Sequence, residues 1–452
     1  MITPISTLRG KMSKVFFETH GCSTNQAEEE VMAGLLKKEG HKIVKSQDDA
    51  DLIVLNMCSV KGLTVTKKAI NKINEHIEQN PHKKMILAGC IPRDEYKELR
   101  EILPNASFLH TDNMMQISEV ANETLNNNIV DLMTPNKGIK IGFSRVRRNP
   151  FIAILPINEG CEDSCTYCST KRIKGKTISY PMRTITKEIE DAVNDGCKEI
   201  WITSQDTCAY GLDQQEKSLL PELLKMILAL DKQFMMRIGM LNPSNLLPVL
   251  DEFLEVMEDK RMYKFLHIPV QAGDNKVLEA MKRRYKKEDI ELIVKKFKQK
   301  FPEGTISTDI IVGFPGETEE QFENTMDLVR NVKFETVNIS RYQDRQGTMS
   351  WRMDSTVKLG DNIKSDRSNI LTDTNRRISM MNNESWLGWE GPILITEKKK
   401  DLIGRNFAYK LIVLKKPDEM REEEYNNLLG KAVKVKIVKA ETFYCVGELI
   451  SK

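Results

Sequence analysis

The chain has 452 residues, of which 40% are hydrophobic and 29% are charged, and its formal net charge is +3. This composition excludes fibrous and intrinsically disordered proteins, and the length is enough for roughly two to four globular domains. No segment approaches the roughly 18 consecutive apolar residues of a membrane helix, and the N-terminus lacks a signal-peptide core, so we expect a cytoplasmic protein with no membrane partner.

In the first part of the chain, short apolar runs alternate with helical patterns. An apolar run at 14–19 is followed by a helical pattern at 25–38, a run at 51–56 by a pattern at 64–79, and a run at 83–89 by a pattern at 94–102. Continuous apolar strands that alternate with helices are typical of a parallel sheet covered on both faces. We therefore expect a Rossmann-like α/β domain over residues 1–118. An asparagine-rich stretch then predicts a connector over residues 119–146.

A second α/β series occupies the middle of the chain. Its apolar runs lie at 151–157, 199–204, 233–241, 264–270, 305–314 and 334–340. About six strands with intervening helices fall short of the eight repeats of a complete (β/α) barrel, so we predict a partial (β/α)6 barrel over residues 147–388.

The last segment, residues 389–452, has short runs with alternating faces and no long helical pattern. This pattern predicts a small all-β barrel. From residue 391 onward, 13 Lys or Arg residues stand against 9 Asp or Glu residues. An excess of positive charge is suited to a polyanionic partner, although lysine-rich strands that only keep a domain soluble give the same pattern.

Three cysteines follow the three apolar runs of the first domain. Cys22, Cys58 and Cys90 each come within a few residues of the end of a run. The carboxyl ends of parallel strands lie along one edge of a sheet, so these thiols are expected to meet in space. Buried cysteines often only fill a core, but three at equivalent strand ends favour a shared metal site.

Three more cysteines, Cys161, Cys165 and Cys168, lie just after the first run of the second series. A zinc ribbon is disfavoured, because no second pair of Cys or His residues follows at a suitable spacing. Three thiolates suit an iron–sulfur cluster, which usually has four thiolate ligands. One iron would then be open to an exogenous ligand.

The segment from Cys161 to Cys168 resembles the CxxxCxxC signature of the radical S-adenosylmethionine (SAM) superfamily, with Tyr167 as the aromatic residue before the last cysteine. The resemblance implies a [4Fe–4S] cluster whose fourth iron is chelated by the amino and carboxylate groups of SAM. It also implies a 5′-deoxyadenosyl radical that abstracts hydrogen from an unactivated carbon, which is chemistry of the cofactor rather than of the protein.

A wider set of segments is similar to the methylthiotransferase family, and residues 389–452 resemble its TRAM module, an OB-like barrel. The segments are THGCSTNQAE, LNMCSVKG, LAGCIP, NEGCEDSCTYCST, TSQDT, PVQAGDNKVLEAMKRRY and TDIIVGFPGETEEQF. The resemblance implies a methylthiotransferase domain over 1–118, a radical SAM barrel over 147–388, and two [4Fe–4S] clusters. It further implies two SAM molecules, one as methyl donor and one as radical source.

Within the family, CSVKGLT, ITSQDTCAYGLD and STKRIKGKTISYP are most similar to the archaeal and eukaryotic branch that acts on N6-threonylcarbamoyladenosine in tRNA. The partners implied are the tRNA anticodon stem-loop, a low-potential electron donor and a sulfur donor. Isopentenyl-adenosine in tRNA and an aspartate of a ribosomal protein remain alternative substrates. A non-catalytic iron–sulfur RNA-binding protein is an alternative of another class.

No catalytic side chain is assigned, but several are candidates for binding. Ser204, Gln205 and Asp206 at a strand end are candidates for the amino and carboxylate groups of SAM, or else they cap the next helix. Candidates for the ribose or adenine of SAM are Gln271, Asp309 and Gly313. Asp309 has the alternative role of accepting buried backbone donors.

The candidate RNA contacts are basic. Four of them, just after the second cysteine triplet, are Lys171, Arg172, Lys174 and Lys176, and a fifth, Arg405, lies in the β segment. Basic side chains at such positions are suited to phosphate contacts without base readout. The alternative for the group of four is a solvated loop.

Overall fold

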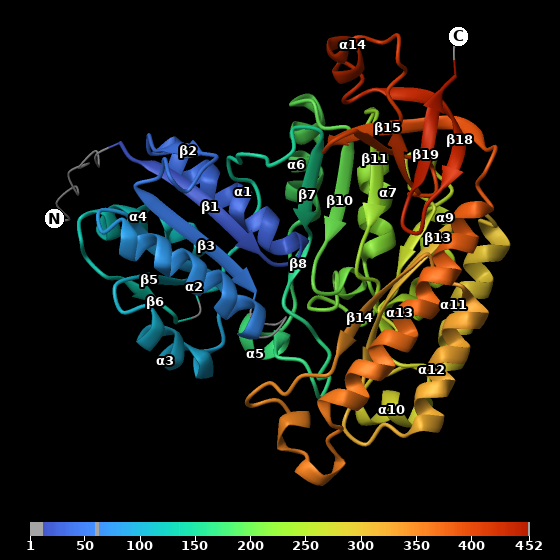
Figure 1. Ribbon diagram of the computed structural model, residues 1–452, viewed down its shortest axis with the longest axis horizontal. Coiled ribbons are helices and arrows are strands. Elements are labelled where there is room, and N and C mark those ends of the chain that lie inside the picture. Colours follow the sequence, from blue (N-terminus) through green and yellow to red (C-terminus); the bar gives the residue numbers. More distant parts are fainter. Residues whose placement is uncertain (1–11, 59–62, 135, 451–452) are drawn as a thin grey trace. The chain divides into compact units, whose positions relative to one another are not determined.

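The structure is a computed structural model that describes residues 12–58, 63–134 and 136–450 (Figure 1). The chain forms two compact units. The first comprises Met1–Arg148 and Ser169–Gly175, and the second comprises Asn149–Cys168 and Lys176–Lys452. Among the described residues, no helix is long and apolar enough to span a bilayer.

The first unit is a six-stranded parallel sheet in the order β2-β1-β3-β4-β5-β6. In that order the strands are Lys42–Val44, Lys14–His20, Leu52–Cys58, Lys84–Cys90, Ser107–His110 and Asp131–Leu132. The helices are α1 (Ser23–Lys38), α2 (Leu63–Gln79), α3 (Arg93–Ile102) and α4 (Ile117–Leu125), with the 3-10 helix η2 at Thr111–Gln116.

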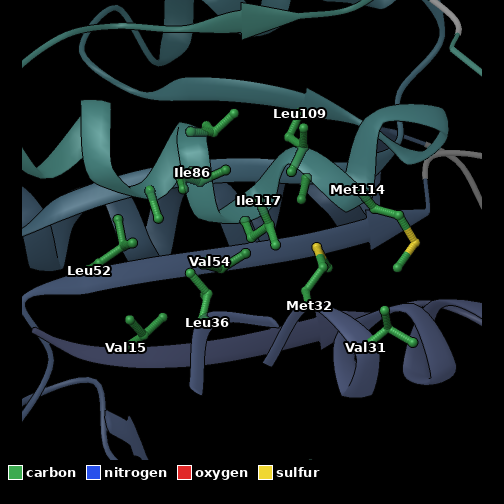
Figure 2. Close-up of a cluster of buried hydrophobic side chains, with 13 residues drawn as sticks. Val15, Val31, Met32, Leu36, Leu52, Val54, Ile86, Leu109, Met114 and Ile117 are labelled. Atoms are coloured by element: carbon green, nitrogen blue, oxygen red, sulfur yellow. The ribbon is translucent and has the colours of Figure 1, made fainter. Parts of the chain in front are cut away.

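Alternate residues of the central strands point to opposite faces of this sheet. Leu52 and Val54 of β3 pack in one cluster with Met32 of α1 and Ile117 of α4 (Figure 2). The intervening Ile53 belongs to a second cluster with residues of α2 and α3. All seven residues of β3 are buried, which explains why its sequence is a continuous apolar run.

The expected connector over 119–146 contains regular structure. Val120 and Ala121 of α4 belong to the buried cluster of Figure 2, and β6 pairs in parallel with β5. Farther along, the backbone N–H of Val146 donates to Glu30 O. The Asn-rich composition concealed a short amphipathic helix, because apolar spacing rather than average polarity decides which face a helix buries.

The second unit begins with the partial barrel. Its parallel strands are β7 (Ile152–Pro156), β10 (Glu199–Thr203), β11 (Met235–Ile238), β12 (Phe265–His267), β13 (Thr305–Val312) and β14 (Thr336–Arg341). The order is β7-β10-β11 and β12-β13-β14, and a parallel bridge between Met236 and Met262 joins the two halves. The predicted partial (β/α)6 barrel is confirmed.

The principal helices that accompany these strands are α6 (Met182–Asn194), α7 (Leu220–Leu228), α9 (Leu250–Val256), α11 (Lys287–Lys300), α12 (Glu319–Val332) and α13 (Asp361–Glu384). Shorter helices include α5 (Thr170–Lys174), which belongs to the first unit, η3 (Thr207–Ala209) and α10 (Asn275–Ala280). Helices between successive parallel strands are the crossover connections that such a sheet requires.

The predicted all-β segment is a closed barrel in the order β15-β16-β17-β19-β18. Its strands are β15 (Glu390–Lys398), β16 (Leu402–Arg405), β17 (Leu411–Leu414), β18 (Ala432–Ala440) and β19 (Cys445–Leu449), with α14 at Glu422–Asn426. Closure removes the sheet edges that an open five-stranded sheet exposes. The barrel is consistent with a TRAM-like domain.

A buried polar contact joins this barrel to the partial (β/α)6 barrel. The side chain of Arg405 is 7% exposed, and its guanidinium lies 2.6 Å from Glu397 Oε1 and 3.8 Å from Glu199 Oε2. The guanidinium also lies over the rings of Trp201 and Tyr409. Glu199 begins β10, so Arg405 links the two barrels from within their interface.

Candidate functional site

The first cysteine triplet lies at one edge of the first unit's sheet. Cys58 and Cys90 end the neighbouring strands β3 and β4 and are register partners, and Cys22, two residues after β1, is the N-cap of α1. The Cys22 thiol donates to Asn25 Oδ1 at 3.4 Å, and Asn25 Nδ2 donates to Cys90 Sγ at 3.8 Å. The fold thus brings the three cysteines together, with Asn25 between two of them.

A buried charge network adjoins this triplet. Lys174 Nζ lies 2.9 Å from Glu28 Oε1, and both side chains are at most 5% exposed. Lys140 Nζ lies 3.6 Å from the same oxygen, and Thr111 donates its hydroxyl to it at 2.7 Å. Glu28 Oε2 also accepts from Asn25 at 3.4 Å. The network therefore connects two buried ammonium groups to the amide that contacts the cysteines.

The Cys90 thiol is buried beside Cys58. A hydrogen bond with Cys58 and burial raise the pKa of the Cys90 thiol well above its usual value, and the charge of Lys174 opposes this shift. Cysteine ligands of a metal must be deprotonated, so a bound metal centre would have to supply positive charge that favours the thiolates.

The second triplet occupies a loop that follows β7 and the short strand β8 (Asn158–Glu159). Thr166 anchors the loop: its N–H donates to Met281 O at 3.1 Å, its hydroxyl to Ala280 O at 3.0 Å, and its carbonyl accepts from Ser350 N at 2.9 Å. Burial raises the pKa values of Cys161 and Cys165. The rigid backbone therefore presents three partly exposed thiols within one loop.

Within the described residues, no group of three or more His, Cys, Asp and Glu side chains is arranged around a single ion. The six candidate ligands are all cysteines, and cysteine thiolate is the usual protein ligand of an iron–sulfur cluster.

Two of the SAM candidates have polar atoms that suit a ligand. Ser204 Oγ and Gln205 Oε1 lie just beyond β10, and both atoms are buried without a hydrogen-bond partner among the described residues. Buried polar atoms are almost always hydrogen-bonded, so these two atoms suit a polar ligand. Asp206 differs, because its carboxylate accepts from Cys208 N at 3.0 Å and from Asn245 Nδ2 at 2.7 Å.

Asp206 thus takes the alternative role of capping η3. Its carboxyl group is buried, and desolvation raises its pKa to about 6. The Asp206 carboxylate can accept a further hydrogen bond from the SAM amino group, because its two oxygens have about four acceptor positions. Asp206 therefore stays a candidate together with Ser204 and Gln205.

The later strand-end candidates are placed differently. Gln271 has a φ of 72°, which is an unusual backbone conformation for a residue other than glycine. Its backbone N–H donates to Asp309 O. The Asp309 carboxylate accepts from His267 Nε2 at 3.2 Å and from Asn338 Nδ2 at 2.8 Å. Gly313 has φ 75°, and its N–H donates to Glu317.

Two of the five predicted RNA contacts are buried in this structure. Lys174 pairs with Glu28, and Arg405 pairs with Glu397 and lies 3.8 Å from Glu199, so an RNA contact at either residue stays a prediction. The remaining three lie nearer the surface: Arg172 is exposed and pairs with Asp94, Lys176 is exposed, and Lys171 is half-buried.

Asn25 and Arg283 contact cysteine sulfurs but were not predicted from the sequence. Asn25 lies inside THGCSTNQAE, and Arg283, which donates to Cys165 Sγ, lies inside PVQAGDNKVLEAMKRRY, two of the segments that resemble the methylthiotransferase family. No periodicity or spacing rule identifies a side chain that reaches a sulfur from a distant segment.

Known proteins match this chain over nearly its whole length. Residues 155–329 match the radical SAM superfamily, and residues 14–110 match "Uncharacterized protein family UPF0004". The solved structure of the radical S-adenosylmethionine methyltransferase TsrM from Kitasatospora setae, with tryptophan and a SAM analogue bound, aligns with a TM-score of 0.50 at 12% identity. The alignment covers 73% of each chain, and it shows a shared fold.

Curated relatives are closer in sequence. A "Probable threonylcarbamoyladenosine tRNA methylthiotransferase" of Archaeoglobus fulgidus is 37% identical over 97% of this chain and 99% of its own length. A "Threonylcarbamoyladenosine tRNA methylthiotransferase" of Drosophila pseudoobscura pseudoobscura is 37% identical over 97% of this chain and 77% of its own length. The chain therefore belongs to the threonylcarbamoyladenosine tRNA methylthiotransferase family.

Proposed function

We propose that this chain attaches a methylthio group to C2 of N6-threonylcarbamoyladenosine next to the anticodon of tRNA. The observation that carries the proposal is the first cysteine triplet, Cys22, Cys58 and Cys90, which lies on the sheet edge of the first unit in addition to the CxxxCxxC loop. Formation of an adenosyl radical needs only the cluster of that loop, so the first triplet indicates an additional task. The names of the relatives supply the substrate.

The proposal assigns one [4Fe–4S] cluster to Cys22, Cys58 and Cys90 and another to Cys161, Cys165 and Cys168. It also assigns two SAM molecules, one as methyl donor and one as radical source. Cys161, Cys165 and Cys168 would hold the cluster that, with SAM, would supply the radical for hydrogen removal from C2, and Cys22, Cys58 and Cys90 would hold the cluster that would supply the methylthio group. The radical would require a low-potential electron donor as partner, and the methylthio group would require a sulfur donor.

The chain's own residues position and shield these groups. Thr166 fixes the cysteine loop through three hydrogen bonds, and Tyr167, 8% exposed, packs within it. Ser204, Gln205 and Asp206 offer hydrogen-bonding atoms to the amino and carboxylate groups of SAM, and Gln271, Asp309 and Gly313 are candidates for contacts with its ribose or adenine. Exclusion of water protects a carbon radical from quenching and strengthens polar contacts inside the site.

Substrate RNA is proposed to meet the basic side chains Lys171, Arg172 and Lys176, which can neutralise phosphates without reading sequence. The target adenine must leave its stack in the anticodon loop, at a cost of a few kcal/mol. The domain roles follow the expected boundaries 1–118, 119–146, 147–388 and 389–452, with α4 and β6 added to the first domain. We place the enzyme in the cytoplasm.

The decisive test is nucleoside analysis of tRNA from cells that lack this chain. Mass spectrometry of the digest is expected to show loss of 2-methylthio-N6-threonylcarbamoyladenosine with accumulation of its precursor. Complementation with the wild-type gene restores the product, whereas complementation with Cys58→Ala does not. An unchanged product level contradicts the proposal, and loss of the isopentenyl-adenosine derivative or of a ribosomal-protein modification selects the alternative substrates.

A further inference from the structure

Arg283 is a buried cation beside the second cysteine triplet. It lies between α10 and α11, and its side chain is 7% exposed. Its Nη1 donates a hydrogen bond to Cys165 Sγ at 3.2 Å. A buried guanidinium is costly unless negative charge faces it, so its partners reveal which group it serves.

Most contacts of Arg283 orient its guanidinium group but supply no negative charge. Nε donates to Tyr285 Oη at 2.9 Å, and Nη2 donates to Asn242 Oδ1 at 3.1 Å and to Pro269 O at 3.5 Å. The guanidinium carbon lies 4.8 Å from the centre of the Tyr285 ring. These hydrogen-bond acceptors are neutral, and together they aim Nη1 at the sulfur.

The carboxylate near Arg283 serves a different arginine. Asp163 Oδ2 lies 3.6 Å from Arg283 Nη1, which exceeds hydrogen-bonding distance. Arg284 donates to Asp163 Oδ1 from Nε at 2.9 Å and from Nη2 at 2.5 Å, and Asn242 Nδ2 donates to Oδ2 at 2.6 Å. Asp163 is therefore chiefly the partner of Arg284, and Arg283 is left with the Cys165 sulfur as its closest acidic group.

We propose that Arg283 is a positioning residue that hydrogen-bonds the Cys165 thiolate and raises the reduction potential of the cluster held by Cys161, Cys165 and Cys168. This inference rests on the proposed function, because it assumes that cluster. A thiolate is a stronger acceptor than a thiol and supplies the negative charge that the buried guanidinium needs. Hydrogen bonds to ligand sulfurs are among the features that set the potential of an iron–sulfur centre.

The direction of the effect follows from charge. A low-potential one-electron donor passes one electron to the [4Fe–4S] core, which goes from 2+ to 1+ while no bond to the protein breaks. The added negative charge interacts favourably with a guanidinium at hydrogen-bonding distance, especially in a buried site. Arg283 thus favours the reduced centre, the form that donates an electron to SAM.

The test isolates this centre in the full-length chain. Cys22, Cys58 and Cys90 are replaced by Ala, so only the second triplet can hold a cluster after anaerobic reconstitution. Into this background we introduce Arg283→Met, Arg283→Lys and, as the matched control, Arg284→Met. Arg284 is the next residue and shares Asp163, but its bonds go to Asp163 and Asn245.

The first readout is an EPR-monitored redox titration. Arg283→Met is expected to lower the ratio of reduced to oxidised cluster about tenfold at a fixed potential, which corresponds to a midpoint about 59 mV more negative for one electron. Arg283→Lys is expected to lie between the wild type and Arg283→Met, because it keeps the charge but loses the planar fork. Arg284→Met is expected to leave the midpoint close to that of the parent. Equal midpoints in Arg283→Met and its parent overturn the inference.

The second readout does not require the Arg283→Met variant to assemble a cluster. Protein with ¹⁵N in its arginine guanidinium groups is reduced, and pulsed EPR records nuclear couplings to the cluster. A ¹⁵N coupling is expected in the parent and in Arg284→Met and is expected to vanish in Arg283→Lys; its absence from the parent overturns the inference. Failure of Cys161, Cys165 and Cys168 to hold any cluster contradicts instead the proposed function.

Discussion

The buried pair of Lys174 and Glu28 allows a quantitative prediction for Lys174→Met. Removal of one partner from a buried ion pair typically destabilises a protein by about 3–5 kcal/mol, because the other charge is left uncompensated. Lys140 remains 3.6 Å from Glu28, and Thr111 still donates to the same oxygen. We therefore expect the low end, about 3 kcal/mol, which is a large part of the roughly 5–15 kcal/mol of a typical domain.

Hydrogen–deuterium exchange with mass spectrometry measures this loss in the intact chain. Amides of β3 and β4 that exchange only through global opening are expected to exchange roughly 100-fold faster, since each 1.4 kcal/mol is a factor of ten. The matched control is Arg172→Met on the same helix, because Arg172 is 41% exposed and its surface ion pair with Asp94 is worth at most about 1 kcal/mol. The double variant Glu28→Gln with Lys174→Met is expected to recover part of the loss. If Lys174→Met and Arg172→Met exchange alike, the buried network does not stabilise the first unit.

Three further predictions concern other buried polar groups. Burial raises the pKa of the Glu30 carboxyl from 4.5 to about 7. Between these pH values the folded state keeps a proton that the unfolded chain releases, so the free energy of unfolding of the first unit should fall by up to roughly 3 kcal/mol as pH rises from about 4.5 to 7. Glu30→Gln should remove this pH dependence in urea titrations, and an unchanged pH dependence contradicts the prediction. Gln205→Ala should weaken SAM binding to the reconstituted protein about tenfold by calorimetry without lowering the stability of the apoprotein, because Oε1 has no protein partner; equal affinity rules out the contact. Arg405→Met should destabilise the junction of the two barrels by about 3 kcal/mol and speed hydrogen–deuterium exchange in β10 and β16. Arg421→Met, which changes a 76% exposed side chain, should do neither. Equal exchange rates in the two variants would refute the buried link between the barrels.

The fold was predictable where local patterns decide it. Continuous apolar runs predicted the buried parallel strands, and the position of Cys58 and Cys90 directly after two of them predicted that they meet, since the ends of neighbouring strands share an edge. The helix α4 was missed because its surroundings are rich in Asn, although Val120 and Ala121 carry the spacing that places them in the core.

The site was less predictable where burial decides the role of a charge. Lys174 and Arg405 carry the positive charge expected of phosphate contacts, but each lies beside a carboxylate that is distant in the sequence. Lys174 pairs with Glu28, and Arg405 lies near Glu199. Nothing in a local pattern shows whether a cation faces water or a buried anion. The same applies to Arg283, whose sulfur partner becomes visible only when the loops are folded together.

The central claim is that two cysteine triplets each hold a [4Fe–4S] cluster. The most direct measurement is the iron and acid-labile sulfide content of anaerobically reconstituted protein, supported by Mössbauer spectra. We expect about eight iron atoms per chain in the wild type and about four when either triplet is replaced by Ala. About four iron atoms in the wild type, with no loss when Cys22, Cys58 and Cys90 are replaced, would contradict it.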